Sequence, residues 1–379
     1  MRILKANYII IGGGISGLSI AYNLAKLGMD KIFLIEKSYL GSGSTGKCGR
    51  GIRQQFTTRE HIVLMRGSVK LWETLSEELG KNIYFRQGGY LWLLRNEKEI
   101  ELFRKYVKFQ NSLNVPSKII SVEEAKEIVP QLNEKVFLAA SYCPTDGTAS
   151  PFDVVEAYAE AALKLGVKIY KFTEVYGIIV ERGEVQGVET SIGRIKSNIV
   201  VNAAGYGAKK LAETAGIKLP LENYRHHIMV TEPLKQFLKP MIVYGSLYFN
   251  QDIHGNIIGG IDLNEKPTNI LMPRIDFLSK FAKNILKVMP ILGGINVLRQ
   301  WTGFYVVTPD HHPILGNVDE VNGLYLATGY SGHGFMMGPI VGKVIAELIV
   351  YGKSSISIDN LNLRRFREGK LIYEKAVIG

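Results

Sequence analysis

Residues 8–36, YIIIGGGISGLSIAYNLAKLGMDKIFLIE, decide the fold of this 379-residue chain. A β-branched run is followed by Gly12-x-Gly14-x-x-Gly17, then by a helical pattern and a second apolar run that ends in Glu36. The glycines permit a tight turn that brings backbone N–H groups close to a pyrophosphate, and the acid can accept a hydrogen bond from a ribose hydroxyl. The stretch therefore predicts a βαβ unit that binds a dinucleotide.

Similar signals recur in the middle and at the end of the chain. The run IVVNAAG at residues 199–205 follows a predicted three-stranded meander, and GLYLATGYSGHGFMMGP at 323–339 is typical of a strand, a glycine turn and a helix. Antiparallel strands are expected at 225–262. We predict a mixed α/β fold, with a Rossmann-like dinucleotide-binding domain around a central parallel sheet and a substrate-binding domain built on a mostly antiparallel sheet. We expect residues 1–85, 150–220 and 300–379 in the first domain and residues 86–149 and 221–299 in the second.

Helix signals lie between these segments. The spacing of apolar residues predicts a long amphipathic helix at 58–79, with Thr57 or Thr58 as its N-cap. Further helices are predicted to begin at the Ser121/Glu124 capping-box pattern, at Ser150-Pro151 and at Pro273, and to end near Pro130, Leu165 and Met289.

The composition excludes several classes of protein. A hydrophobic fraction of 46% can fill a large core, which excludes a disordered chain. The two cysteines, Cys48 and Cys143, are far apart in the sequence, so we expect no disulfide framework or zinc knuckle and a cytoplasmic location. Apolar runs are shorter than the ~20 residues of a membrane span, so no transmembrane helix is expected. The net charge of +11 is mostly spread over faces of mixed sign, apart from a C-terminal basic cluster of Arg364, Arg365, Arg367 and Lys370.

The distribution of glycine favours FAD over NAD. Fourteen of the 40 glycines lie in three short segments, 12–17, 41–51 and 329–342. A long flavin cofactor needs support from more than one βα turn, whereas NAD enzymes usually carry the glycine motif in a self-contained domain. We therefore expect three backbone approaches to one extended cofactor.

Four motifs together resemble the D-amino-acid oxidase and sarcosine oxidase family of FAD-dependent amine oxidoreductases. They are IIIGGGISGLSIAYNLAKLG near the N-terminus, VVNAAG, TPDHHPILG and GYSGHGFMMGP, so the resemblance covers essentially the whole chain. Within the family, GSGSTGKCGRGIRQQF at 41–56 and CPTDGTASPF at 143–152 are most similar to the catalytic beta subunits of archaeal dye-linked L-proline dehydrogenases. The expected cofactor-binding residues are Gly12, Gly14, Ile15, Ser16, Gly17, Glu36, Lys37, Ser44, Thr45, Val175, Ala203, Ala204, Gly205, Gly303, Gly329, Gly332, His333, Gly334, Phe335 and Met336.

The resemblance implies hydride transfer from the carbon that bears the amine to flavin N5. Such a site needs orientation more than a strong base, and an arginine fork suits the substrate carboxylate. Sarcosine oxidases place two arginines after the first glycine loop against flavin and substrate, and GRGIR supplies Arg50 and Arg53 in matching positions. The expected catalytic residues are Arg53, Arg50, Tyr248 and His333, with Trp301 as a further candidate for the pocket wall.

Three departures from sarcosine oxidases set further expectations. Ile258 stands where those enzymes carry the lysine that activates oxygen, so we expect poor use of oxygen. Gly303 replaces the cysteine that tethers FAD in the monomeric enzymes, so we expect non-covalent FAD. Met336 replaces a carboxylate-binding lysine, and either Arg299 or Arg225 is a candidate to supply the missing cation.

Histidine and cysteine add little to this interpretation. The pairs His226-His227 and His311-His312 do not predict a metal site, because neighbours on a strand point to opposite faces. Cys48, in a glycine-rich loop, is either a reactive or flavin-contacting thiol or a small buried hydrophobe.

The leading hypothesis is an FAD-dependent dehydrogenase of a secondary-amine amino acid, L-proline first, that passes electrons to a dye-like or quinone-type acceptor. One alternative is a peroxide-forming oxidase of sarcosine, glycine or a D-amino acid. Another is a flavoprotein subunit that is active only in a complex, and the related dehydrogenases imply further subunits, oligomers and an FMN at a subunit contact. The positive charge also allows a flavin-dependent tRNA-modifying protein, although we expect no nucleic-acid partner.

Overall fold

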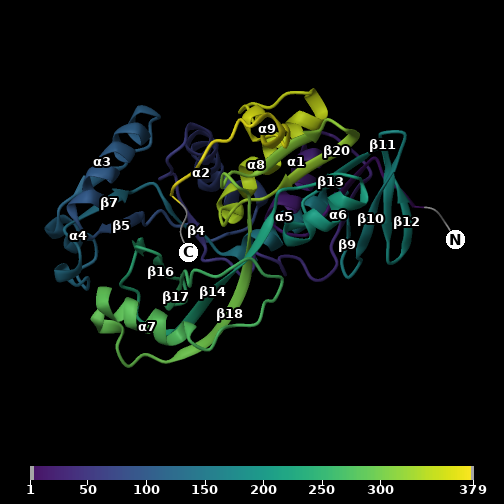
Figure 1. Ribbon diagram of the computed structural model, residues 1–379. Helices are drawn as coiled ribbons and strands as arrows, with labels where there is room; N and C mark the ends of the chain where they lie inside the picture. Colours follow the sequence, from purple (N-terminus) through teal and green to yellow (C-terminus); the bar gives the residue numbers. More distant parts are fainter. Residues whose placement is uncertain (1–3, 377–379) are drawn as a thin grey trace.

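The computed structural model describes residues 4–376, which form two large sheets with helices packed around them (Figure 1). Five parallel strands form the centre of the ten-stranded sheet, in the order β9-β3-β2-β13-β20. Their bounds are β2 (Tyr8–Ile11), β3 (Ile32–Ile35), β9 (Lys168–Tyr170), β13 (Ile199–Asn202) and β20 (Val321–Thr328). The predicted parallel sheet is confirmed.

Shorter strands extend this sheet. A meander precedes β13, as predicted, and consists of the antiparallel strands β10, β11 and β12, with β11 joined to the parallel core through β20. Its strands were expected at 167–175, 177–182 and 184–190, but the first of these runs is β9 of the parallel core, and the turn expected at Gln186-Gly187 lies inside β11. The bounds here are β1 (Leu4–Lys5), β10 (Val175–Glu181), β11 (Glu184–Thr190), β12 (Gly193–Lys196) and β19 (Ile314–Val318). A separate two-stranded ribbon pairs β4 (Gly51–Ile52) with β8 (Gly147–Thr148) and fixes the loop that follows the second glycine segment.

Helices α1 (Ile15–Lys26) and α8 (Gly334–Tyr351) pack closely beside the parallel strands. The approach depends on glycine, because a Cβ on Gly338 would lie 2.6 Å from the Ile15 side chain and one on Gly342 would lie 1.9 Å from Ser19 Oγ. Helices α2 (Arg59–Leu79), α5 (Pro151–Lys164), α6 (Ala208–Thr214) and α9 (Arg364–Glu368) complete this part of the chain.

Helix α8 alone, within residues 4–376, is long and apolar enough to cross a membrane by length and composition. Of its 18 residues, 61% are buried inside the molecule, where the helix packs against α1 and α2. Burial in the core therefore accounts for its apolar composition.

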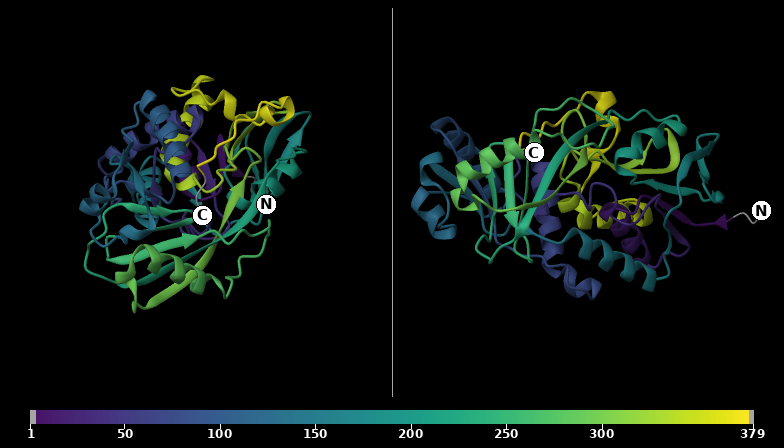
Figure 2. Two further views of the ribbon diagram at one scale, coloured as in Figure 1. Left: turned by 60° about the vertical axis from the view of Figure 1, so that its left-hand side comes forward. Right: turned by 90° about the horizontal axis from the view of Figure 1, so that it is seen from below.

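The second sheet has eight strands in the order β18-β14-β17-β16-β15-β5-β7-β6 and is antiparallel except between β15 and β5. Helix α7 lies below it in Figure 1, and α3 and α4 lie at the far end from the parallel sheet (Figures 1 and 2). The strands are β5 (Tyr90–Leu94), β6 (Lys118–Ile120), β7 (Ala139–Cys143), β14 (Glu222–Pro233), β15 (Met241–Tyr244), β16 (Leu247–Gln251), β17 (Asn256–Ile261) and β18 (Val297–Val307), and the helices are α3 (Glu97–Ser112), α4 (Val122–Ile128) and α7 (Phe277–Val288). Strand β18 runs across residue 300, where the sequence suggested a domain boundary.

The predicted helix starts are largely confirmed. Ser121 and Glu124 form the capping box of α4, and Ser150 caps α5 with Pro151 in the first turn. Thr58 is the N-cap of α2 by position, but its side chain makes no cap bond. Helix α3 was not predicted, because only three of its residues are buried and its apolar stripe is correspondingly thin.

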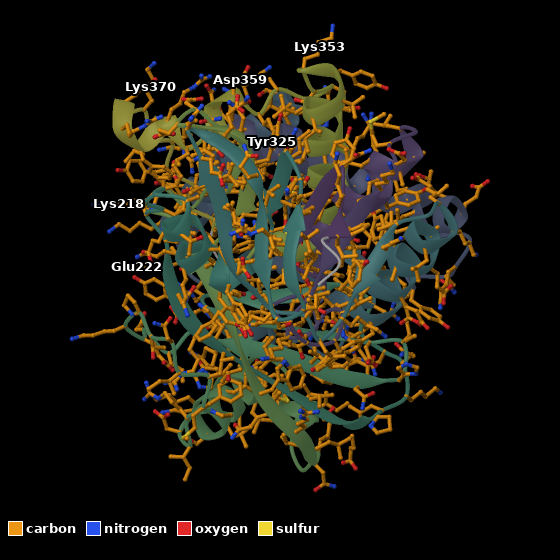
Figure 3. All side chains as sticks on the ribbon, turned by 90° about the vertical axis from the view of Figure 1, so that its right-hand side faces the viewer. Lys218, Glu222, Tyr325, Lys353, Asp359 and Lys370 are labelled. Atoms are coloured by element: carbon orange, nitrogen blue, oxygen red, sulfur yellow. The ribbon has the colours of Figure 1, made fainter. Side chains whose placement is uncertain are left out.

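Three of the four residues in the C-terminal basic cluster have acidic partners. Arg365 is buried against Asp310, Arg367 pairs with two acids of the β19–β20 turn, and Lys370 lies 2.8 Å from a carboxylate oxygen of Glu368. Figure 3 shows Lys353, Asp359 and Lys370 at the rim of the molecule. The cluster therefore forms a face of mixed sign rather than a basic patch.

Candidate functional site

The turn between β2 and α1 is built for a close backbone approach. Gly12 has a φ of +114°, and a Cβ on this residue would lie 2.4 Å from the carbonyl oxygen of Ala203. Gly17 was predicted to bind the cofactor, but it does not line the cavity described below. A Cβ there would lie 2.0 Å from the Gly12 oxygen, so Gly17 acts by letting α1 pack against its own turn.

Glu36 closes the same turn from β3. Its buried carboxylate accepts hydrogen bonds from the Gly13 backbone N–H at 2.7 Å and from the Ser38 N–H at 2.8 Å. The acid is thus held at the carboxyl end of the parallel strands, where open α/β sheets bind their ligands.

A cavity of about 630 Å³ opens at this edge of the sheet. Its walls come from the turn after β2, the 42–48 loop, residues 173–176, residues 203–211, β14, β18 and the turn before α8. The predicted residues that line it are Gly12, Gly14, Ile15, Ser16, Glu36, Lys37, Ser44, Thr45, Val175, Ala203, Ala204, Gly205, Gly303, Gly329, Gly332, Gly334 and Phe335. Its volume and its glycine walls fit an extended dinucleotide such as FAD.

The 42–48 loop is fastened on both sides of this cavity. Thr45 Oγ1 accepts a hydrogen bond from the Ile15 N–H at 3.2 Å, and Ser44 Oγ donates to the Phe304 carbonyl at 2.7 Å. The loop therefore bridges the N-terminal glycine turn and strand β18, and its last residue, Cys48, also lines a smaller cavity.

The smaller cavity, of about 60 Å³, shares Cys48, Tyr305, Gly332 and Phe335 with the large one. All four predicted catalytic residues line it: Arg50, Arg53, Tyr248 and His333. His333 and Met336 line this cavity and not the larger one, so their expected contact with the cofactor stays a prediction. The sequence thus predicted a group of side chains that the fold brings together at one end of the large cavity.

Arg53 is the buried cation of the small cavity, with 1% of its surface exposed. It donates to the Gln55 carbonyl at 2.6 Å and to the Ala376 carbonyl of the C-terminal tail, and it lies 3.1 Å from His333 Nε2. Its guanidinium carbon is 3.9 Å from the centre of the Phe56 ring.

Burial lowers the pKa of Arg53, and nearby Tyr90, Glu374 and Asp146 oppose that effect. Of its five N–H groups, these contacts leave those on Nε and one on Nη1 for a ligand.

Arg50 faces the same cavity but is already paired. Its Nη1 lies 2.9 Å from Asp252 Oδ2, and its φ of +69° is left-handed. The pairing fixes Arg50 to the turn between β16 and β17, so Arg53 is the cation with donors left over.

Three tyrosines that converge from separate strands form the apolar wall. Tyr90 lies on β5, Tyr248 on β16 and Tyr305 on β18, and only Tyr248 was predicted. Burial raises the pKa of Tyr248 well above its usual range and that of Tyr305 to about 12, so both keep their hydroxyl protons. Tyr248 Oη makes no hydrogen bond of regular geometry among the described residues, although Tyr305 lies close enough to affect its pKa, so the hydroxyl can still bind a polar group in the cavity. Met241 completes this wall and was also missed.

The pair His226-His227 on β14 points to opposite faces, as expected, whereas His311-His312 lies between β18 and β19, outside any strand. His226 stacks on Tyr305 with 3.7 Å between ring centres and lines the large cavity, whereas His227 packs against Phe277. Burial lowers the pKa of His226 to about 3, so this ring is neutral.

Neither candidate for a second carboxylate-binding cation reaches the small cavity. Arg225 lies 2.6 Å from a carboxylate oxygen of Glu265, and Arg299 is exposed on β18. Trp301 lies outside both cavities and donates to the Lys47 carbonyl at 3.3 Å.

Burial raises the pKa of the Cys48 thiol to about 11, so a thiolate is disfavoured at the junction of the two cavities.

Comparisons with other proteins agree with this geometry. The family model described as "FAD dependent oxidoreductase" (DAO) matches residues 7–348. The crystal structure of L-proline dehydrogenase from P. horikoshii superposes with a TM-score of 0.94 at 43% identity, covering 98% of this chain and all of that one. Sarcosine oxidase subunit beta of Rhodobacter capsulatus is 31% identical over 99% of this chain and 92% of its own length. The mitochondrial pyruvate dehydrogenase phosphatase regulatory subunit of Mus musculus is also 31% identical, but this chain spans only 43% of it. The chain therefore belongs to the DAO family of FAD-dependent oxidoreductases.

Proposed function

We propose that this chain is a dehydrogenase that oxidises the C–N bond of a secondary-amine amino acid, with L-proline as the first candidate. The observation that carries the proposal is the small cavity, in which a buried arginine with free donors faces three tyrosines at the end of the FAD-sized cavity. The 43% identity to a structure named L-proline dehydrogenase supports the choice of substrate.

The chain's own residues would bind and orient the substrate. Arg53 would hold the carboxylate through its remaining N–H groups, and Tyr248 Oη would accept a hydrogen bond from the amine. Tyr90, Tyr305 and Met241 would surround the pyrrolidine ring and exclude water from the reacting carbon. The Arg53 cation, the neutral Tyr248 hydroxyl and the apolar wall would together hold the substrate in one orientation.

FAD, held by the glycine turns, Glu36 and the loop at 42–48, would supply the acceptor for the hydride. The family description names FAD alone, so the proposal includes no FMN. Gly303 lines the large cavity and offers no side chain for a covalent tether, so FAD would be held non-covalently. Ile258, in the apolar cluster around Tyr248, supplies no cation to activate oxygen, so electrons would pass to a dye-like or quinone-type acceptor.

The chain would work as part of an assembly in the cytoplasm. The relative from Rhodobacter capsulatus is named as a subunit, which supports association with other dehydrogenase subunits. Cys48 and Cys143 are unpaired, as a reducing compartment requires. The two sheets support a division into an FAD-binding part and a substrate-binding part.

The purified single chain, loaded with FAD, tests the proposal in parallel assays with L-proline. The expected result is rapid reduction of an artificial dye and little hydrogen peroxide in air. Rapid peroxide formation in proportion to substrate would identify an oxidase. Dye reduction that appears only after other subunits are added would identify a subunit that is active only in a complex.

A further inference from the structure

A second buried polar cluster lies behind the substrate cavity, formed by His61, His312 and Glu374. His61 is on α2, His312 follows β18, and Glu374 is in the C-terminal tail, so three distant segments meet. One ligand-capable atom from each lies within 4.8 Å of the other two, and all three residues are buried. None of them lines either cavity, so the cluster is separate from the proposed catalytic site.

The His61 ring is the unexplained member of this cluster. It is 1% exposed, and neither of its nitrogens has a hydrogen-bond partner in the described part of the chain. A buried polar group without a partner costs about 1–3 kcal/mol, so such a group usually has a water, an ion or a function. Its Nδ1 lies 3.7 Å from Glu374 Oε2. That separation is close to the ~3.3 Å between two ligands of a tetrahedral zinc ion.

His312 is oriented as a metal ligand. Its Nδ1 lies 3.0 Å from the Asp310 carbonyl oxygen, which can only accept, so Nδ1 carries the proton and Nε2 holds the lone pair. Metal-binding histidines almost always donate their other N–H to such a partner. The Asp310 carboxylate is itself paired with Arg365 at 2.8 Å, which holds this loop in place.

Thr58 connects the two remaining ligands. Its hydroxyl lies 2.9 Å from His312 Nε2 and 3.0 Å from Glu374 Oε2, but it has a single proton to donate. A metal ion bound to the His312 lone pair would take the place of the Thr58 hydroxyl, so the Thr58 side chain must rotate away from Nε2 when the ion binds. Glu374 also accepts from the Thr57 and Thr58 backbone N–H groups, which orient its oxygens at the start of α2.

We propose that His61, His312 and Glu374 bind a divalent first-row transition metal, with zinc as the best match. Two imidazoles and one carboxylate form a ligand set that suits zinc, whereas calcium and magnesium prefer oxygen ligands alone. The ligand atoms lie within 4.8 Å of one another and must approach by up to about 1.5 Å, a movement within the range of side-chain rotation. The bound metal fastens the C-terminal tail to α2, and the same tail carries the Ala376 carbonyl that contacts Arg53. Sequence spacing could not reveal this site, because it uses only one member of a histidine pair.

Zinc binding to the full FAD-loaded chain tests the proposal without any substrate. Protein freed of metal by dialysis against EDTA is equilibrated with zinc chloride, and bound zinc is measured by elemental analysis. We expect one zinc per chain in the wild type and in the surface control His254→Gln. His61→Phe, which keeps an aromatic ring against Phe56, and Glu374→Gln should each bind at least about 100-fold more weakly, because loss of outer-shell partners alone costs about 10–100-fold.

Anomalous scattering at the zinc absorption edge locates the ion in crystals of the wild type, even if a variant fails to fold. A peak between His61, His312 and Glu374 supports the site. A peak elsewhere, absence of stoichiometric binding, or equal binding by His61→Phe and the wild type would overturn it. Because no turnover is measured, failure of the proposed dehydrogenase activity would leave this result unaffected.

Discussion

Arg53→Lys tests the proposed carboxylate clamp while keeping a positive charge in the cavity. Three of the arginine's contacts serve the protein, and the N–H groups left on Nε and Nη1 would bind the substrate carboxylate. A lysine ammonium has three donors in a compact head and cannot satisfy both sets of acceptors. A hydrogen bond to a charged group contributes about 1.5–3 kcal/mol, so loss of one or two should cost about 3 kcal/mol. That loss lowers kcat/KM for L-proline by about 150-fold.

The assay compares L-proline with L-prolinamide, which lacks the carboxylate. Dye reduction is measured for the wild type, Arg53→Lys and the control Arg104→Lys, which changes an exposed arginine. Bound FAD is quantified for each variant, so that loss of cofactor is distinguished from loss of substrate binding. We expect a large loss with L-proline and a loss of less than about fivefold with L-prolinamide. An equal loss with both substrates, or full activity of Arg53→Lys with L-proline, would refute the clamp.

Three further predictions concern the cofactor turn, a buried acid and the helix contact. Gly12→Ala puts a Cβ 2.4 Å from a backbone oxygen and should yield protein without bound FAD. The control Gly28→Ala, also at positive φ but with no atom within 4 Å of its Cβ, should keep FAD. Equal FAD content in the two variants would contradict this prediction. Burial raises the pKa of Asp146 from 3.8 to about 7, so the folded chain keeps a proton that the unfolded chain releases, and stability should fall by about 4 kcal/mol as pH rises from about 4 to about 7. The free energy of unfolding of Asp146→Asn, measured in urea, should therefore change less with pH over this range. The same pH dependence as in the wild type would argue against a buried, protonated Asp146. Gly342→Ala overpacks the contact between α1 and α8 and should lower the free energy of unfolding in urea by about 1–3 kcal/mol. If this variant is as stable as the wild type, the two helices can move apart to make room for the methyl group.

The parallel sheet and the FAD-sized cavity could be predicted because their signals are local. The glycine turn, the acid at the end of β3 and the turn before α8 each act through backbone geometry within a few residues. Arg50 and Arg53 were identified by resemblance to a family, and the fold places both at the small cavity. For these two arginines, residue type and position in the motif were enough to predict a place in the site.

The rest of the site depends on contacts that have no local signal. Tyr90 and Tyr305 lie on strands far apart in the sequence and meet only because β5 and β18 belong to one curved sheet. Helix α2 takes its cap from Glu374, 316 residues beyond Thr58, instead of from its own N-cap side chain. Local capping rules cannot anticipate a partner that tertiary structure supplies.

An anaerobic titration of the FAD-loaded chain, followed by the visible absorbance of the flavin, tests the proposed reaction most directly. L-Proline, D-proline, sarcosine and glycine are added in turn, without dye or oxygen. We expect rapid and complete bleaching with L-proline. Sarcosine should act more slowly. If no imino or N-methyl amino acid bleaches the flavin, the proposed reaction is wrong.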